Sequence, residues 1–255
     1  AVAESAAADC PPPFTRLTRP DPNHRSLLHH PMLPVLASPA LAAGALGAAL
    51  PPPCLCIFDV DRTLTAQQGS AGRCAGTEEQ GGVVDTAYGG GTLVLSDLAV
   101  NLHTTICAAC RFAIISAGPA GGEGSLERTA LWRVLGGGAK AGTMPAWTAW
   151  PNRDGRSPFV VTAPEGRKQE AVPGILRWYE RERRTSIDAS AVYFFDDKPN
   201  NVRPFVGSGY HARQVSCASR DTSSAARGDC GGTAAEAASA WTGVAICGSL
   251  SPPPP

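Results

Sequence analysis

Short apolar runs alternate with helical patterns between residues 54 and 217, and this order restricts the fold more than any other property of the chain. An apolar run of four to eight residues is typical of a strand that is buried on both faces of a parallel sheet. The sequence therefore predicts an α/β fold, a Rossmann-like, doubly wound parallel sheet of about five strands with helices on both faces. The five runs are Cys54–Val60, Arg111–Gly118, Pro158–Ala163, Ala191–Asp197 and Ala212–Cys217.

Helical patterns occupy the gaps between these runs. Ser96 and Ser125 are of a residue type that caps helix N-termini, and Thr233 with Glu236 has the spacing of a capping box. The predicted helices are LSDLAVNLHTTICAA (residues 95–109), LERTALWRVL (residues 126–135), a segment from about Arg167 to Arg183, and TAAEAASAW from Thr233.

The two ends of the chain differ in composition from its middle. A chain of 255 residues is long enough for one sizeable domain or two small ones. We predict one folded domain at residues 54–245, between an Ala- and Pro-rich extension at residues 1–53 and a Pro-rich tail at residues 246–255. For the uncharged stretch Met32–Leu50 two interpretations stay open, a targeting segment and a disordered or loosely packed extension. Its prolines and its many Ala and Gly residues argue against a stable membrane span, and the default compartment is the cytoplasm.

The charges of the chain balance. It has 22 Lys and Arg residues against 22 Asp and Glu residues, so its formal net charge is zero. Nucleic-acid-binding proteins normally have a basic excess, and no nucleic-acid partner is therefore expected. The oligomeric state leaves no pattern in the sequence.

Nine cysteines are spread along the chain without a tight framework. Cys54 and Cys56 lie in the first predicted strand and are interpreted as small core residues, since free cysteine is often buried. The C-x-x-C pair formed by Cys107 and Cys110 has no second pair at metal-binding spacing, so we interpret it as structural thiols. In an oxidising compartment, a bridge near the C-terminus would join Cys230 and Cys247.

Acidic and hydroxyl side chains follow three of the predicted strands where each strand ends. In parallel sheets, ligands bind at the carboxyl ends of the strands, so these side chains are expected to converge. Four carboxylates cannot share one site without compensation, and a hard cation with oxygen ligands meets that need. Mg²⁺ together with a phosphate group fits best. The residues are Asp59 and Asp61 after the first strand, Ser116 after the second, and Asp196 and Asp197 after the fourth.

A fixed cation is needed beside these acids, and the chain has only three lysines. Lys168 stands at the start of the helix that leads into the fourth strand, where the helix N-terminus also attracts anions. Lys198 directly follows the aspartate pair and is the rival candidate. We predict Lys168 as the cation of the site.

These motifs resemble those of the haloacid dehalogenase-like (HAD) superfamily of phosphotransferases. FDVDRTLT is similar to its first motif, D-x-D-x-T-[LV], and AIISAG is similar to its second, a strand that ends in Ser or Thr. Lys168 fits the third motif, and VYFFDDKPNN resembles the paired-aspartate form of the fourth. The resemblance extends from about Cys54 to Cys217 and implies a Mg²⁺-dependent phosphatase.

The resemblance also implies a role for each residue. Asp59 would be the nucleophile that accepts the phosphoryl group, and Asp61 would be the general acid and base. The phosphoryl oxygens would be held by Ser116, Ala117 and Lys168. The metal ligands would be Asp59, Asp196, Asp197 and, through its backbone carbonyl, Asp61.

Two departures from the family pattern bear on the surroundings of the site. Arg62 replaces the usual Gly of the first motif, and its side chain is either solvated or an extra cation over the substrate. The aspartate pair lacks the upstream Gly of the commoner fourth motif, as in members that resemble magnesium-dependent phosphatases, so no large cap domain is expected. Two inserts are candidates for small lids, Asp85–Thr92 and Ala146–Arg156, although for the second a loop packed on the sheet edge is favoured.

The leading hypothesis is a phosphomonoester hydrolase with an open site that accepts phosphoproteins or other bulky phosphorylated substrates. One alternative is a small-metabolite phosphatase or phosphomutase in which the two inserts form a lid. A second alternative is a non-catalytic scaffold of the same fold that binds partners through its Pro-rich ends. The charge cluster argues against the scaffold, because a binding protein has no reason to retain so costly an arrangement.

Overall fold

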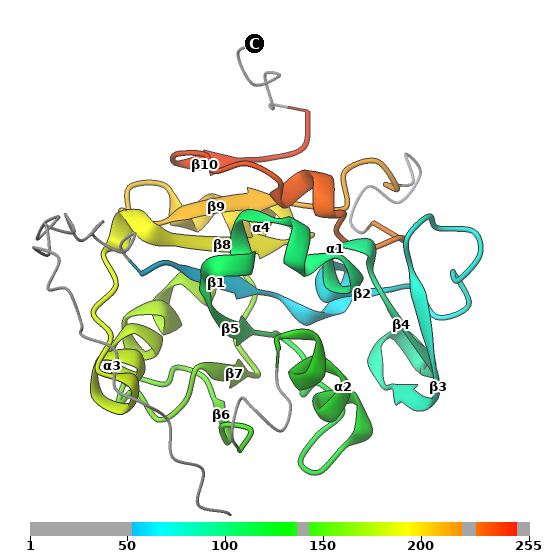
Figure 1. Ribbon diagram of the computed structural model, residues 1–255, viewed down its shortest axis with the longest axis horizontal. Coiled ribbons are helices and arrows are strands. Elements are labelled where there is room, and N and C mark those ends of the chain that lie inside the picture. Colours follow the sequence, from blue (N-terminus) through cyan, green and yellow to red (C-terminus); the bar gives the residue numbers. More distant parts are fainter. Residues whose placement is uncertain (1–52, 137–142, 221–227, 249–255) are drawn as a thin grey trace, which may run out of the picture. The chain divides into compact units, whose positions relative to one another are not determined.

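A seven-stranded parallel sheet forms the centre of the computed structural model, which describes residues 53–136, 143–220 and 228–248 (Figure 1). The strand order is β10-β9-β8-β1-β5-β7-β6, from the top to the bottom of the view in Figure 1. All neighbouring pairs run parallel. The strands are β1 Leu55–Phe58, β5 Arg111–Ile115, β6 Trp147–Ala149, β7 Phe159–Val161, β8 Val192–Asp196, β9 His211–Gln214 and β10 Val244–Ala245.

The α/β class and the parallel sheet are confirmed, but the sheet has more strands than the sequence predicts. Each of the five predicted runs contains a strand of the sheet, namely β1, β5, β7, β8 and β9. The two additional strands, β6 and β10, form the two edges and have only three and two residues. Runs this short give no periodic signal, which is why the sequence pattern does not reveal them.

Helices cover both faces of the sheet. Along β1 the side chains alternate: Cys56 and Phe58 belong to one buried cluster, Leu55 and Ile57 to the other. The first cluster includes residues of α1 and α2, and the second includes residues of α3 and α4. This two-sided burial explains why the strand is continuously apolar. The helices are α1 Asp97–Val100, α2 Leu126–Val134, α3 Val172–Arg183 and α4 Pro199–Val202.

The predicted caps are present, although the first predicted helix is shorter than expected. The Ser96 hydroxyl accepts a hydrogen bond from the Ala99 amide at 3.2 Å. At the start of α2, the Ser125 hydroxyl accepts one from the Arg128 amide. After α1 the chain continues in two short 3-10 turns instead of one helix. Thr105 donates to the Leu102 carbonyl and accepts from the Cys107 amide. Side-chain bonds of this kind compete with the helical ladder and end it.

A small antiparallel sheet follows β1 and contains the hairpin of β3 and β4. Its strand order is β2-β4-β3, with β2 at Thr65–Ala66, β3 at Glu78–Asp85 and β4 at Gly91–Leu95. The predicted insert Asp85–Thr92 therefore lies at the tip of this hairpin. The second insert contributes the edge strand β6, as the sheet-edge interpretation expects.

The chain divides into two units, Ala1–Ala48 and Ala49–Pro255, and the two predicted inserts belong to the second. Residues 1–52 of the predicted extension, which include Met32–Leu50, lie outside the described residues. Residues 249–255 of the predicted tail lie outside them as well. Among the residues that the structure describes, no helix has the length and apolar character needed to cross a membrane.

Four disulfides join eight of the nine cysteines, and they correct the interpretation of the cysteines as core thiols. Cys230 and Cys247 each form a disulfide, but not with each other. Their sequence proximity is misleading, because the fold brings a more distant cysteine to each of them. The pairs are Cys54–Cys110, Cys56–Cys107, Cys74–Cys230 and Cys217–Cys247.

Simple geometry explains the first two pairs. Residues two apart on a strand point to the same face, so Cys54 and Cys56 present both thiols to one side of the sheet. Cys107 lies in a 3-10 turn and Cys110 directly follows it, and residues three apart on such a turn are eclipsed. A C-x-C strand and a C-x-x-C turn can therefore pair twice. The β1 strand that leads to Asp59 is thus cross-linked to the segment before β5.

Removal of the buried Cys56–Cys107 disulfide is expected to lower the free energy of unfolding by about 2–4 kcal/mol, because the bridge restricts the unfolded chain. The measurement is urea unfolding of the Cys56→Ala/Cys107→Ala double variant beside the wild type, without reductant. In saturating reductant the difference should shrink, since both proteins then lack the bridge. Equal stabilities without reductant would show that the bridge does not constrain the unfolded state.

Candidate active site

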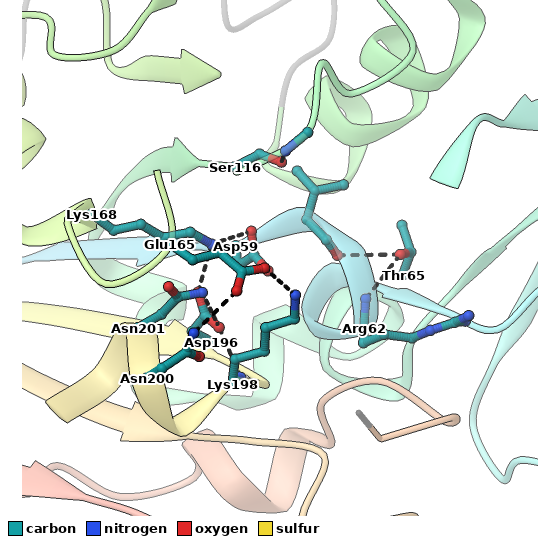
Figure 2. Close-up of polar contacts among 12 residues, drawn as sticks. Asp59, Arg62, Thr65, Ser116, Glu165, Lys168, Asp196, Lys198, Asn200 and Asn201 are labelled. Atoms are coloured by element: carbon teal, nitrogen blue, oxygen red, sulfur yellow. Dashed lines mark hydrogen bonds and ion pairs between the residues drawn. The ribbon is translucent and has the colours of Figure 1, made fainter. Parts of the chain in front are cut away.

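Three adjacent strands bring the predicted site residues to one edge of the sheet. Asp196 ends β8, Asp59 follows β1, and Ser116 follows β5. Because β8, β1 and β5 are parallel neighbours, their carboxyl ends meet, as the sequence predicts. Figure 2 shows Asp59 and Asp196 joined through Lys168, with Ser116 apart from them on the neighbouring strand end.

Lys168 is the cation at the centre of this region. It lies in the turn Lys168–Ala171 just before α3 and is fully buried. Its Nζ atom is 2.6 Å from Asp59 Oδ1 and 2.6 Å from Asp196 Oδ2 (Figure 2). Burial lowers the pKa of Lys168, but the Asp196 and Asp59 carboxylates raise it by a larger amount. The pKa is therefore above its ordinary value, and the amine stays charged.

Lys198, the rival candidate, points to a different partner. Its amine forms an ion pair with Glu165 and is partly exposed. Its backbone amide donates to Asp196 Oδ1 at 2.8 Å. The structure therefore brings Lys168, and not the Lys198 side chain, between the two aspartates.

Asn201 holds Asp196 in place. Its amide nitrogen lies 3.1 Å from each carboxylate oxygen of Asp196, and its Oδ1 accepts from the Gly166 amide at 2.8 Å. The same side chain thus fixes both Asp196 and the loop just before Lys168. These contacts make Asn201 a direct partner of the acid cluster.

Asp197 has the opposite environment, because its carboxylate is buried and neither oxygen has a hydrogen-bond partner among the described residues. One oxygen from each of Asp59, Asp196 and Asp197 lies within 4.8 Å of the others. Lys168 compensates only one of these three charges. A bound divalent cation is the simplest partner for the other two charges, so this buried cluster could hold a metal ion.

The electrostatics of the cluster agree with a missing positive charge. Burial and, to a smaller extent, the neighbouring Asp196 raise the pKa of Asp197 to about 7. Burial also raises the pKa of Asp59 well above its ordinary value, against the lowering effect of Lys168. Because Asp196 already accepts bonds on both oxygens, Asp59 and Asp197 have more capacity for a metal ion.

The Asp61 carboxylate belongs to a second group of acids and not to the buried cluster. One oxygen from each of Asp61, Asp85 and Glu127 lies within 4.8 Å of the others. Burial and then Asp85 raise the pKa of Asp61, while Lys168 lowers it. Burial and Asp85 also raise the pKa of Glu127 to about 7. A metal contact by Asp61, predicted through its backbone carbonyl, stays a prediction.

Arg62 corrects the interpretation of a solvated side chain, since it is only 4% exposed. It sits in the tight turn Val60–Leu64 with a left-handed φ of 63°, where Gly is the favoured residue. Its amide donates to the Thr65 hydroxyl at 3.3 Å, and that hydroxyl donates to the Val60 carbonyl (Figure 2). Its guanidinium carbon lies 4.6 Å from the centre of the Tyr88 ring.

The segment after β5 approaches Asp61 closely. Ser116 is buried, and its hydroxyl accepts from the Gly118 amide at 3.1 Å. A Cβ atom on Gly118 would lie 3.3 Å from Asp61 Oδ2 and 3.8 Å from Ser116 Oγ, so a larger residue would crowd both side chains. Ala117 is exposed and lines the cavity beside Asp61. Phosphate binding by Ser116 and Ala117 stays a prediction.

A cavity of about 300 Å³ opens beside the Asp61 carboxylate. The hairpin tip contributes Tyr88, and the segment after β5 contributes mostly small residues. The sequence pattern does not predict most of these lining residues, because an acid in the first turn of a helix, such as Glu127, gives no sequence signal of its own. The lining residues are Asp61, Thr86, Ala87, Tyr88, Ala117, Gly118, Pro119, Ala120, Glu127, Glu165 and Lys198.

Comparison of the chain with protein-family models and with curated proteins finds no match. Among solved structures, it is similar to a hypothetical protein from Xanthomonas campestris, with 19% sequence identity and a TM-score of 0.37. The similarity covers 73% of this chain and 79% of that one.

Proposed function

We propose that the protein is a magnesium-dependent phosphomonoester hydrolase that acts through an aspartyl-phosphate on Asp59. The proposal rests above all on the Lys168 amine between Asp59 and Asp196, next to the unpartnered Asp197 carboxylate. A nucleophilic carboxylate needs nearby positive charge to approach a phosphate dianion, and the fixed lysine supplies it. The order of the motifs along the chain, similar to that of HAD phosphotransferases, and the α/β sheet support the same activity.

In the first step Asp59 attacks phosphorus. A bond forms between a carboxylate oxygen of Asp59 and phosphorus while the bond to the ester oxygen breaks. The departing alkoxide takes the proton of Asp61, whose raised pKa suits a general acid. Lys168, Ser116 and the backbone amide of Ala117 would hold the three phosphoryl oxygens, where charge builds in the transition state.

In the second step water attacks the phosphorus of the aspartyl-phosphate. Asp61, now ionised, takes a proton from that water, so the acid of the first step becomes the base of the second. The bond between phosphorus and Asp59 breaks, inorganic phosphate leaves, and both aspartates return to their starting states. The closeness of the Asp61 carboxylate to Gly118, in the segment after β5, supports this role.

The donor set fits Mg²⁺, which prefers carboxylate oxygens and keeps several waters. Asp59 and Asp197 would hold it, with Asp196 and the Asp61 backbone carbonyl as further candidates. When bound, the ion neutralises the excess charge of the cluster and polarises a phosphoryl oxygen. Asp196 has a second role here, because it anchors Lys168 through their 2.6 Å contact.

The surroundings favour a small leaving group over a phosphoprotein. The hairpin tip with Tyr88 forms one wall of the 300 Å³ cavity, and this size is at the lower end for ligand pockets. Of the two inserts considered as lids, only the first contributes to this cavity. We therefore place the protein among small-substrate phosphatases with a doubly wound, Rossmann-like core and no large cap.

Hydrolysis of 4-nitrophenyl phosphate should require Mg²⁺ and stop in excess chelator, and Mg²⁺ should raise the melting temperature. The thermal shift should be larger at pH 8 than at pH 6. Asp197 has a folded-state pKa of about 7, above its unfolded value, so the metal-free protein loses stability as pH rises through 7 and the ion restores it.

The Asp197→Asn variant is the matched control for this experiment. It should lose most of the Mg²⁺-dependent shift, and without metal it should be more stable than the wild type at pH 8, because one buried charge is gone. Full activity in chelator, or an equal Mg²⁺ shift in the variant, would contradict the metal assignment.

A further inference from the structure

The 300 Å³ cavity beside Asp61 is where the leaving group of a phosphomonoester must lie. Asp61 lines it and would donate its proton to the ester oxygen, so the group attached to that oxygen extends away from Asp59 into this space. The residues that line it therefore meet the part of the substrate that differs from one phosphomonoester to another. This inference rests on the proposed phosphatase function.

One wall of the cavity is the aromatic ring of Tyr88, which the Arg62 guanidinium contacts. Tyr88, at the tip of the β3–β4 hairpin, is 44% exposed and lines the cavity. The buried Arg62 guanidinium lies over its ring at 4.6 Å and comes from the same turn as Asp61. Arg62 thus ties the hairpin tip to the turn that follows β1. A cation in the cavity can contact this electron-rich ring, whereas an anion gains nothing from it.

The charges that line the cavity are mainly negative. Asp61, Glu127 and Glu165 contribute carboxylates, and Lys198 is the one basic side chain in the lining. Lys198 is already paired with Glu165. The buried Asp85 carboxylate has an oxygen within 4.8 Å of the Asp61 and Glu127 carboxylates. Even with Asp61 protonated as the general acid, an acidic group on the substrate would face the Glu127 carboxylate, and an ammonium group would be attracted to it.

We propose that this cavity selects phosphomonoesters of amino alcohols, with an uncharged alcohol accepted less well and an acidic alcohol rejected. Glu127 and Glu165 are the specificity-determining residues. Tyr88 is the wall against which the carbon chain and its ammonium group lie. The phosphate itself is held separately, at Lys168, so the two ends of the substrate meet opposite charges.

The test compares three esters that have the same three-carbon chain: 3-aminopropyl phosphate, propyl phosphate and the phosphate ester of 3-hydroxypropanoate. Values of kcat/KM are measured with Mg²⁺ at pH 8, where Glu127 is mostly ionised. We expect the amino ester to exceed the acidic ester by at least about tenfold. In Glu127→Gln/Glu165→Gln the ratio should fall to one or below, since both substitutions keep the side-chain shape and remove the charge, and Lys198 loses its partner carboxylate.

Glu182→Gln serves as the control, because this exposed glutamate pairs with Arg181 on α3 and does not line the cavity. It should keep the wild-type ratio. An acidic ester hydrolysed as well as the amino ester, or a ratio unchanged in the double variant, overturns the inference and leaves the phosphatase function in place. So does activity on 4-nitrophenyl phosphate with none of the three esters hydrolysed. Failure of every phosphate ester overturns the proposed function, and this inference with it.

Discussion

Asp59→Asn is expected to abolish phosphate ester hydrolysis, with a loss of roughly 10⁴-fold or more in kcat, the range found when a catalytic nucleophile is removed. The amide lacks the negative oxygen that attacks phosphorus, and no phosphoenzyme should form with any substrate. The ion pair between Asp59 and Lys168 would also become a contact between the charged amine and a neutral amide. Rapid-quench mass spectrometry should show the unmodified mass at all times.

Asp61→Asn should fail in a different way. The nucleophile is intact, and an aryl phosphate with a good leaving group needs little protonation in the first step. The second step still needs a base to activate water. The variant should therefore accumulate an aspartyl-phosphate on Asp59, detected as a mass increase of one phosphoryl group. With an alkyl phosphate both steps need Asp61, so little should accumulate.

The two variants control for each other, because both remove one carboxylate from the end of the same strand. Accumulation in Asp59→Asn in place of Asp61→Asn would mean that the two roles are exchanged. If neither variant traps phosphate and hydrolysis continues unchanged in both, the aspartyl-phosphate mechanism is wrong.

The fold was largely predictable from the sequence, because its strands are buried on both faces. The apolar composition of runs such as Cys54–Val60 predicts this burial directly. The edge strand Val244–Ala245 carries no such signal, since two residues have no period. The disulfides were not predictable either. They depend on which turn lies against β1, and that is decided by packing between segments about fifty residues apart.

The candidate site divides in the same way. Asp59, Ser116 and Asp196 end buried parallel strands, so chain topology alone brings them together. Tyr88 and Glu127 lie in a hairpin tip and in the first turn of a helix, and only the tertiary packing places them over Asp61. Arg62 is an intermediate case. Arg62 departs from the motif that the sequence resembles, which has Gly there, but the contact of its buried side chain with Tyr88 depends on the hairpin, which local pattern does not predict.

The Lys168 environment predicts a large effect on both activity and stability. Lys168→Ala leaves Asp59 and Asp196 buried without their shared cation. Breaking a buried ion pair on one side typically costs about 3–5 kcal/mol of folding free energy. Loss of an electrostatic catalytic group lowers kcat by roughly 10²–10³-fold.

Lys198→Ala is the matched comparison for this variant. It removes an equal side chain from a partly exposed pair with Glu165, and exposed pairs contribute about 1 kcal/mol or less. Its loss of activity on 4-nitrophenyl phosphate should stay below about tenfold. Burial already raises the pKa of Asp59 and Lys168 lowers it, so without Lys168 that pKa should rise further. The stability deficit of Lys168→Ala should therefore shrink as pH falls and the Asp59 carboxylate becomes neutral. Urea unfolding at pH 5 and pH 8 measures this difference. A larger loss of activity in Lys198→Ala, or a deficit in Lys168→Ala that grows as pH falls, would mean that Lys168 is not the cation that balances these acids.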